Sequence, residues 1–208
     1  MAGDQSEPQI IDDCVPLLEA AGQQKELGNA AVKRKAYHEA IAAYNHGIAI
    51  LDKADGHPIL RSEGLQMVTL KATLYSNIAQ CCLSQELYRR AIEAADSCLQ
   101  IDPEHSKALF RRSLAFEALR SYGAALQDVE ALKALGGGGL SEDALSARLA
   151  ELQKKQAEVE RLEREEQQSK AEDPMGMAMV NVKESASTRS ARSMTSATVR
   201  RLARWQIG

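Results

Sequence analysis

The segment LYSNIAQCCLSQELYRRAIEAADSCLQIDP, residues 74–103, is followed by a second segment with the same pattern, LFRRSLAFEALRSYGAALQDVEALKAL, residues 109–135. Asn77 and Arg111 stand at matching places in the two segments, 34 positions apart (111 − 77). A pattern that returns after a few tens of residues indicates a stack of similar units, each burying its apolar face against its neighbours. The period therefore also decides which side chains of successive units face the same surface.

An upstream copy extends the pattern to three units. The units align on a small residue early in each second helix, namely Ala40, Ala91 and Ala125. This alignment places repeats near residues 21–54, 72–105 and 106–139, with offsets of 51 and 34 residues. The larger offset leaves an insertion near residues 55–71. Gly56 and Pro58 predict a break there, and the rest of the insertion is expected to extend the next helix backwards.

A period of about 34 residues is the signature of the tetratricopeptide helix–turn–helix repeat. We therefore predict an all-α fold with three tetratricopeptide repeats within residues 13–140. The low aromatic content, 4%, also favours closely packed helices over a β-sandwich. Small residues at equivalent places are predicted to let neighbouring helices pack closely: Gly28, Ala79 and Ser113 in one set, and Ala40, Ala91 and Ala125 in the other. Spacings of three and four residues predict a buried stripe that contains Leu27, Ala31, Tyr37, Ala40, Ile41, Tyr44 and Ile48.

The two ends of the chain differ from the repeats. Residues 1–12 are predicted to be disordered, and the four glycines of residues 136–139 are expected to end the third repeat. Ser141 is a suitable N-cap for a further helix, residues 141–170, whose first half is predicted to cap the repeats. Its charged second half either projects into solvent or pairs as a short coiled coil. Residues 171–208 are predicted to be a disordered, basic, Ser/Thr-rich tail. The tail's end, VRRLARWQIG, is either solvated or touches an anionic membrane or a calmodulin-like partner.

Composition excludes several classes of function. The net charge of −3 argues against a nucleic-acid-binding protein, and no apolar run reaches the length of about 20 residues that spans a bilayer. The acidic start lacks the features of a signal peptide, so a cytoplasmic location is expected. The four scattered histidines form no pair at metal-ligand spacing, and we predict neither a metal nor a cofactor. The cysteines show no Cys-x-x-Cys spacing and are predicted to be reduced: Cys14, Cys81, Cys82 and Cys98.

Five polar residues are predicted to face one groove, because the first helix of each pair lines the concave side of the stack. They come from three successive first helices and are Lys25, Asn29, Asn77, Lys107 and Arg111. Lys25 and Asn29 are four residues apart, as are Lys107 and Arg111, so each pair shares a helix face. Three cations and two amides suit two neighbouring carboxylates, such as a terminal carboxylate beside an aspartate, together with a peptide backbone. The alternative is that the five are ordinary solvated residues.

The three segments that carry these residues resemble a known peptide-binding family. KELGN (25–29), LYSNIAQC (74–81) and KALFRRS (107–113) are similar to the segments of the tetratricopeptide two-carboxylate clamp found in co-chaperones of heat-shock proteins 70 and 90. The resemblance covers roughly residues 15–150 and implies a right-handed superhelix. It also implies that Lys25, Asn29, Asn77, Lys107 and Arg111 bind the chaperones' C-terminal Glu-Glu-Val-Asp. Gln80 and Leu83 lie further along the groove and leave the preferred chaperone open.

Two further residues are candidates for extending the groove. Lys33 lies one helical turn beyond Asn29 and either extends the basic surface or is simply solvated. Phe110 precedes Arg111 and either lines an apolar pocket for the ligand's valine or packs between repeats. The predicted function is thus a non-enzymatic adaptor that docks a heat-shock protein 70 or 90 C-terminus. The alternative is a scaffold that assembles other proteins through its outer surface or its C-terminal helix.

An enzyme is the third reading of the sequence. We find no phosphate-binding loop after a strand and no nucleophile–histidine pair with a supporting acid. The four-glycine run follows a helical pattern and is not followed by Lys-Ser or Lys-Thr, so it does not match a phosphate loop. We therefore predict that the chain is not an enzyme.

Overall fold

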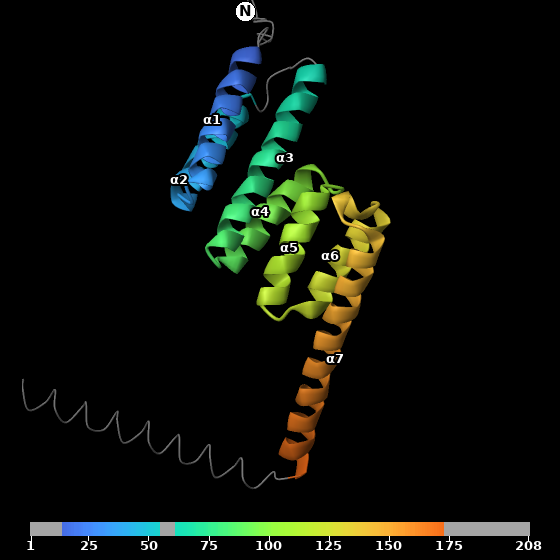
Figure 1. Cartoon of the computed structure of the whole chain (residues 1–208). Coiled ribbons are helices and arrows are strands. Elements are labelled where there is room, and N and C mark those ends of the chain that lie inside the picture. The colour runs from blue at the N-terminus through green and yellow to red at the C-terminus, as the bar shows by residue number, and fades with distance from the viewer. Residues whose placement is uncertain (1–13, 55–60, 173–208) are drawn as a thin grey trace, which may run out of the picture. The chain divides into compact units, whose positions relative to one another are not determined.

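The computed structural model describes residues 14–54 and 61–172 (Figure 1). The chain divides into two compact units, residues 1–156 and residues 157–208. The disorder predicted for residues 1–12 lies outside the described residues, as do the break at Gly56 and Pro58 and the predicted disordered tail from residue 173 onwards. The prediction was wrong for residues 171 and 172, which are the last two residues of a helix. The predicted domain boundary near residue 140 stays a prediction.

The described part of the first unit consists of helices that pack in pairs. α1 packs on α2, α3 on α4 and α5 on α6, while α2–α3 and α4–α5 contacts join one pair to the next. The first helices of the pairs, α1, α3 and α5, also contact one another in order. The helices are α1 (Val15–Lys33), α2 (Tyr37–Asp52), α3 (Arg61–Ser84), α4 (Tyr88–Ile101), α5 (Ser106–Ala118), α6 (Tyr122–Ala134), the short η1 (Gly137–Gly139) and α7 (Glu142–Glu172). The described residues contain no strand, which confirms the all-α prediction.

The turns inside the three pairs have one conformation. Each contains a non-glycine residue in the left-handed region, at Lys35 (φ 60°), Glu86 (φ 58°) and Arg120 (φ 59°). These positions are 51 and 34 residues apart, the same offsets that the sequence alignment gives. A left-handed non-glycine residue is unfavourable on its own, so its recurrence shows that the packing of each pair imposes the turn.

Small residues are buried where the helices approach closely. Ala79, Ser113, Ala40, Ala91 and Ala125 are fully buried, and Gly28 is buried against Tyr44, as the repeat alignment predicts. The prediction was wrong for Leu27, whose side chain is 58% exposed. The neighbouring Gly28 faces α2 instead, because a one-residue shift rotates a helix position by about 100°.

We expect Gly28→Ala to destabilise the fold by about 1–3 kcal/mol, since a core position with no free space must shift its surroundings. A Cβ at residue 28 would lie 2.3 Å from Cε1 of Tyr44. Gly22→Ala on the same helix is the matched control, because a Cβ there meets nothing within 4 Å. It should stabilise the helix by about 0.5–1 kcal/mol. Urea unfolding followed by circular dichroism would measure both changes, and equal effects from the two substitutions would contradict the packing described here.

The insertion after the first repeat lengthens α3, as predicted. The helix begins at Arg61, eleven residues before Ala72, where the second repeat aligns (72 − 61). The four glycines of residues 136–139 all have positive φ and end the last helix pair. They are followed by α7, whose first turn is capped by the hydroxyl of Ser141, which accepts a hydrogen bond from the backbone N–H of Ala144 (3.2 Å).

The first half of α7 packs on the third helix pair. Leu145 and Leu152 are buried in a cluster with Ala125, Val129 and Leu132 of α6. Arg148 and Lys155 of α7 both form ion pairs with Glu117 of α5, at 2.7 and 2.6 Å. This segment therefore covers apolar surface that the third pair would otherwise expose, which is the role of an end cap in a repeat array.

The described part of the second unit is the end of α7, residues 157–172. Its side chains are mainly charged and exposed, and Arg161–Glu165 and Glu166–Lys170 form ion pairs one helical turn apart. Leu162 is 52% exposed. Whether this segment projects alone or pairs with another helix stays a prediction.

Candidate functional site

A pocket of about 390 Å³ brings together three of the five predicted clamp residues. Asn77 comes from α3, while Lys107 and Arg111 lie one turn apart on α5. Lys107 is exposed and Asn77 is partly buried, and neither side chain has a partner among the described residues. Two side chains of the turn before α5, Asp102 and Glu104, border the same pocket. The pocket thus combines free donors with an acidic rim.

Arg111 is held in place by two residues of α3. Its Nη1 donates hydrogen bonds to the carbonyl oxygen and to the hydroxyl of Ser76, at 2.7 and 2.5 Å. Its Nε donates to Oε1 of Gln80 at 3.1 Å. An arginine has five N–H donors, and these three bonds leave both donors of Nη2 without a partner among the described residues. Neutral groups therefore orient the guanidinium, while the edge that carries Nη2 stays available to donate hydrogen bonds.

The charge of Arg111 is not compensated by any carboxylate in the described part of the chain. Burial holds the pKa of this guanidinium below its ordinary value. The adjacent Arg112 has the opposite environment, because it pairs with Asp128 through Nη2 (2.6 Å) and with Asp96 through Nη1 (2.5 Å). Hydrogen bonds from these acids raise the pKa of Arg112. A half-buried arginine without a carboxylate partner leaves a positive charge uncompensated, which makes this pocket the candidate anion site of the described residues.

Lys25 and Asn29, the other two predicted clamp residues, do not line this pocket. They lie on α1 and both contact Glu26, with Lys25 Nζ 3.5 Å from Oε1 and Asn29 Nδ2 donating to Oε2 at 3.4 Å. The carboxylate of Glu26 is exposed and bonds both groups at long distances. A ligand carboxylate that binds Lys25 and Asn29 would share their donors with Glu26, because the ammonium has three N–H donors and the amide nitrogen has two.

Tyr44 interacts with one residue from each of the two groups of predicted clamp residues. Its hydroxyl donates a 2.8 Å hydrogen bond to Oδ1 of Asn29. Burial raises the pKa of Tyr44 to about 12, and the positive charge of Arg111 partly opposes this shift. Tyr44 thus fixes Asn29 while lying within electrostatic reach of Arg111. The bond also leaves the Asn29 amide nitrogen as the group that can donate to a ligand.

Two more pockets adjoin the one around Arg111. The first, of about 290 Å³, is lined by Phe110, Leu132 and the glycine turn together with Lys107, Arg111 and Gln80. Phe110 thus lines an apolar pocket, and it also packs against the α6–α7 core cluster and lies 5.6 Å from the guanidinium of Arg148. The position of Phe110 is therefore compatible with both alternatives, lining an apolar pocket and packing between helices. Lys33 is exposed at the end of α1 and lines none of these pockets.

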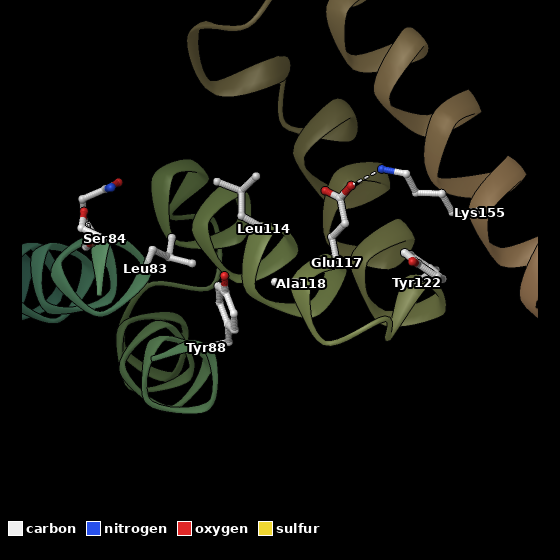
Figure 2. Close-up of a pocket in the computed structure, with 9 residues that line it drawn as sticks. Leu83, Ser84, Tyr88, Leu114, Glu117, Ala118, Tyr122 and Lys155 are labelled. Carbon is white, nitrogen blue, oxygen red and sulfur yellow. Dashed lines mark hydrogen bonds and ion pairs between the residues drawn. The ribbon is translucent and has the colours of Figure 1, made fainter. Parts of the chain in front are cut away.

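The second neighbouring pocket, of about 520 Å³, lies at the other ends of α3 and α5. Figure 2 shows Leu83, Tyr88, Leu114 and Tyr122 in its lining, with the ion pair between Glu117 and Lys155 at one flank. Gln80 lines this pocket as well as the one at Phe110. The three pockets consequently follow one another along the first helices of the last two pairs.

Sequence reasoning missed the residues that position Arg111. Gln80 was expected along the groove, but no sequence pattern predicted that it or Ser76 would bind Arg111, because a buried serine and an exposed glutamine are both common on helices. Tyr44 was predicted as core and is 1% exposed, but its hydroxyl bond to Asn29 was not predicted. The repeat period was the one signal that we identify. It places Ser76 at the position equivalent to Phe110, because Asn77 is equivalent to Arg111.

The remaining reactive groups form no second site in the described residues. All four cysteines are buried, and burial raises the pKa of Cys81 to about 11 and that of Cys98 to about 12. Such thiols are protonated and unreactive near neutral pH. No group of three potential metal ligands occurs among the described residues. None of the helices in the described ranges is both long and apolar enough to cross a membrane.

Comparison with curated proteins finds relatives that match part of the chain. The chain is 33% identical over 116 residues to protein unc-45 homolog B of Xenopus laevis, covering 54% of this chain and 11% of the relative. It is 32% identical over 111 residues to serine/threonine-protein phosphatase T of Aspergillus oryzae, covering 53% and 20%. The chain therefore spans a small fraction of the length of these relatives. No protein-family model matches the chain.

Solved structures with the same architecture are tetratricopeptide-repeat (TPR) domains. The TPR domain of Arabidopsis OM64 is 28% identical with a TM-score of 0.51, covering 65% of this chain and 98% of that one. The second TPR domain of human RPAP3, in complex with the HSP70 peptide SGPTIEEVD, is 26% identical with a TM-score of 0.52, covering 66% and 98%. The chain has the fold of a tetratricopeptide-repeat domain. The resemblance that its sequence suggests is thereby confirmed at the level of the fold and of its TPR relatives.

Proposed function

We propose that this TPR domain is a non-enzymatic adaptor that binds the acidic C-terminal Glu-Glu-Val-Asp of heat-shock protein 70 or 90. The observation that carries the proposal is Arg111. Its guanidinium is half-buried and oriented by Ser76 and Gln80, and its Nη2 donors have no partner among the described residues. A carboxylate placed against Nη2 would form charge-assisted hydrogen bonds, which are about twice as strong as neutral ones. Binding a ligand acid would thus compensate a charge that the free protein leaves unpaired.

The neighbours of Arg111 support a ligand with two adjacent carboxylates. Lys107 supplies an ammonium one helical turn away, and the Asn77 amide can donate to a carboxylate or accept from a peptide N–H. Lys25 and Asn29 would bind the second carboxylate in competition with Glu26. Capture of a C-terminal carboxylate is an established mode of peptide recognition, and the RPAP3 domain with a peptide ending in EEVD has the same fold.

The ligand side chains that precede the C-terminal aspartate would bind in the two neighbouring pockets. The pocket at Phe110 and Leu132 is small and largely apolar and suits the penultimate valine. Gln80 connects it to the pocket at Tyr88 and Tyr122, where a larger side chain further upstream would fit. We also propose that the adaptor works in the cytoplasm, which the buried thiols of Cys81, Cys82 and Cys98 favour.

The proposal predicts that the ligand must end in a free carboxylate. Calorimetric titration of the chain with a peptide ending in Glu-Glu-Val-Asp should show binding, and amidation of the peptide's C-terminus should weaken it about ten- to hundredfold. The reason is that losing one charged hydrogen-bond partner costs about 1.5–3 kcal/mol. Binding of the free-acid peptide should also weaken as salt is raised, but less than for fully exposed ion pairs.

The same peptide separates the adaptor from a scaffold that uses its outer surface. An adaptor should release its captured chaperone when the free Glu-Glu-Val-Asp peptide is added in excess, and should retain it with the amidated peptide. Equal affinity for the free and the amidated peptide would contradict the proposed function.

A further inference from the structure

His105 stands immediately before α5, the helix that carries Lys107 and Arg111. Its backbone is extended (φ −68°, ψ 90°), and its side chain caps the helix by accepting a hydrogen bond at Nδ1 from the backbone N–H of Ala108 (3.2 Å). Helix caps are usually Ser, Thr, Asp or Asn, so an imidazole in this position is unusual. The cap fixes both the orientation and the protonation pattern of the ring.

The cap determines which ring nitrogen carries the proton. A nitrogen that accepts a hydrogen bond from a backbone N–H must present its lone pair, so the neutral ring carries its proton on Nε2. Burial lowers the pKa of His105 below its usual value. The carboxylate of Asp102 and a hydrogen bond with the residue's own backbone oppose this shift, whereas the charges of Arg111 and Lys107 add to it. The lowered pKa favours the neutral ring at pH 7, and the cap at Nδ1 favours the tautomer that carries its proton on Nε2.

That donor belongs to a ring that borders the pocket of about 390 Å³ containing Asn77, Lys107 and Arg111. No hydrogen bond from Nε2 to another residue occurs among the residues that the structure describes. The acids that share the pocket rim are Asp102 and Glu104, and Asp102 accepts a hydrogen bond from the backbone N–H of Glu104 (3.2 Å). A neutral donor here adds a hydrogen bond for an anion without placing a third positive charge beside Lys107 and Arg111.

We propose that His105 is a further ligand-binding residue of this site, whose Nε2–H donates a hydrogen bond to a carboxylate of the bound acidic peptide. The inference rests on the proposed function, because it assumes that the pocket takes a peptide acid. It assigns two tasks to one ring: Nδ1 holds the first turn of α5, and Nε2 contacts the ligand.

The test replaces the ring while keeping the cap. His105→Ser retains a hydroxyl that can accept from the N–H of Ala108, but it has no donor that reaches the ligand. We expect calorimetry with a peptide ending in Glu-Glu-Val-Asp to show about a tenfold loss of affinity, the effect of one hydrogen bond to a charged group. His46→Ser, at an exposed position on α2, is the matched control and should bind as the unchanged chain does.

A measurement on the unchanged chain covers the case in which His105→Ser is poorly folded. Two-bond ¹H–¹⁵N spectra should show His105 protonated at Nε2 and not at Nδ1, and adding the peptide should shift its Nε2 resonance. An Nε2 resonance that stays in place while the Lys107 backbone amide shifts would overturn the inference, as would unchanged affinity of His105→Ser. If Arg111→Ala also binds the peptide as the unchanged chain does, the proposed function fails instead.

Discussion

Replacement of Arg111 by alanine should abolish most of the peptide affinity while leaving the fold intact. The guanidinium makes three hydrogen bonds to Ser76 and Gln80 but pairs with no carboxylate in the described residues. In the ligand complex it would supply charge-assisted bonds from Nη2, each worth about 1.5–3 kcal/mol. We therefore expect at least a tenfold, and up to about a hundredfold, rise in the Kd for a peptide ending in Glu-Glu-Val-Asp, measured by calorimetry.

The stability of the same variant distinguishes a binding residue from a structural one. Arg111→Ala removes hydrogen bonds to Ser76 and Gln80, but it also removes a half-buried charge whose burial lowers its own pKa. These effects oppose one another, so the free energy of unfolding should change by less than about 1 kcal/mol. Saturating peptide should raise the Tm of the unchanged chain and not that of the variant. A variant that binds normally, or one that unfolds, would contradict this assignment.

A site that keeps an unpaired cation carries a cost in the free protein. Arg111 is held by neutral oxygen atoms, which orient it without neutralising it. The site is thereby preorganised for an anion, and less reorganisation is needed when the ligand binds. On α1 the arrangement differs, because Glu26 already contacts Lys25 and Asn29. Competition from Glu26 lowers the net gain from that half of the site, so we expect the α5 residues to dominate the affinity.

The order and pairing of the helices could be predicted from the sequence because they depend on period and residue size. The offsets of 51 and 34 residues locate the turns at Lys35, Glu86 and Arg120, and the insertion is absorbed as extra turns of α3. The error at Leu27 shows the limit of this reasoning. Apolar spacing alone cannot tell whether Leu27 or Gly28 faces α2, and the close approach of Tyr44 to the backbone decides for Gly28.

The partners of the site residues could not be predicted in the same way. Period and spacing place Asn77, Lys107 and Arg111 on successive first helices, but a hydrogen bond forms or fails over less than 1 Å. The bonds from Arg111 to Ser76 and from Tyr44 to Asn29 depend on how the helices pack in three dimensions. Glu26, whose carboxylate lies between Lys25 and Asn29, has no sequence signal that separates it from any other exposed glutamate.

Replacement of Arg112, the next residue along α5, should lower the stability of the fold and leave peptide affinity nearly unchanged, whereas replacement of Arg111 should do the reverse. Its guanidinium joins three helices, forming two hydrogen bonds to Asp128 of α6 (3.0 and 2.6 Å) and one to Asp96 of α4 (2.5 Å). Asp128 is only 4% exposed, so removing Arg112 leaves a buried carboxylate without its charged partner. Such a loss costs about 3–5 kcal/mol. We expect Arg112→Ala to lower the Tm by about 10 °C, measured by circular dichroism.

The two acids bonded to Arg112 provide graded controls for this prediction. Asp96→Ala should cost less than about 1 kcal/mol, because the Asp96 side chain is 43% exposed and its ion pair is weakened by solvent. Replacing both Arg112 and Asp128 by leucine should recover much of the loss, since it leaves no buried charge unpaired. The folded fraction of Arg112→Ala should bind the peptide within about threefold of the normal affinity. The reason is that Arg112 lines none of the three pockets described for the site. If Arg112→Ala lost peptide affinity while keeping its Tm, the roles assigned to the two adjacent arginines would have to be exchanged.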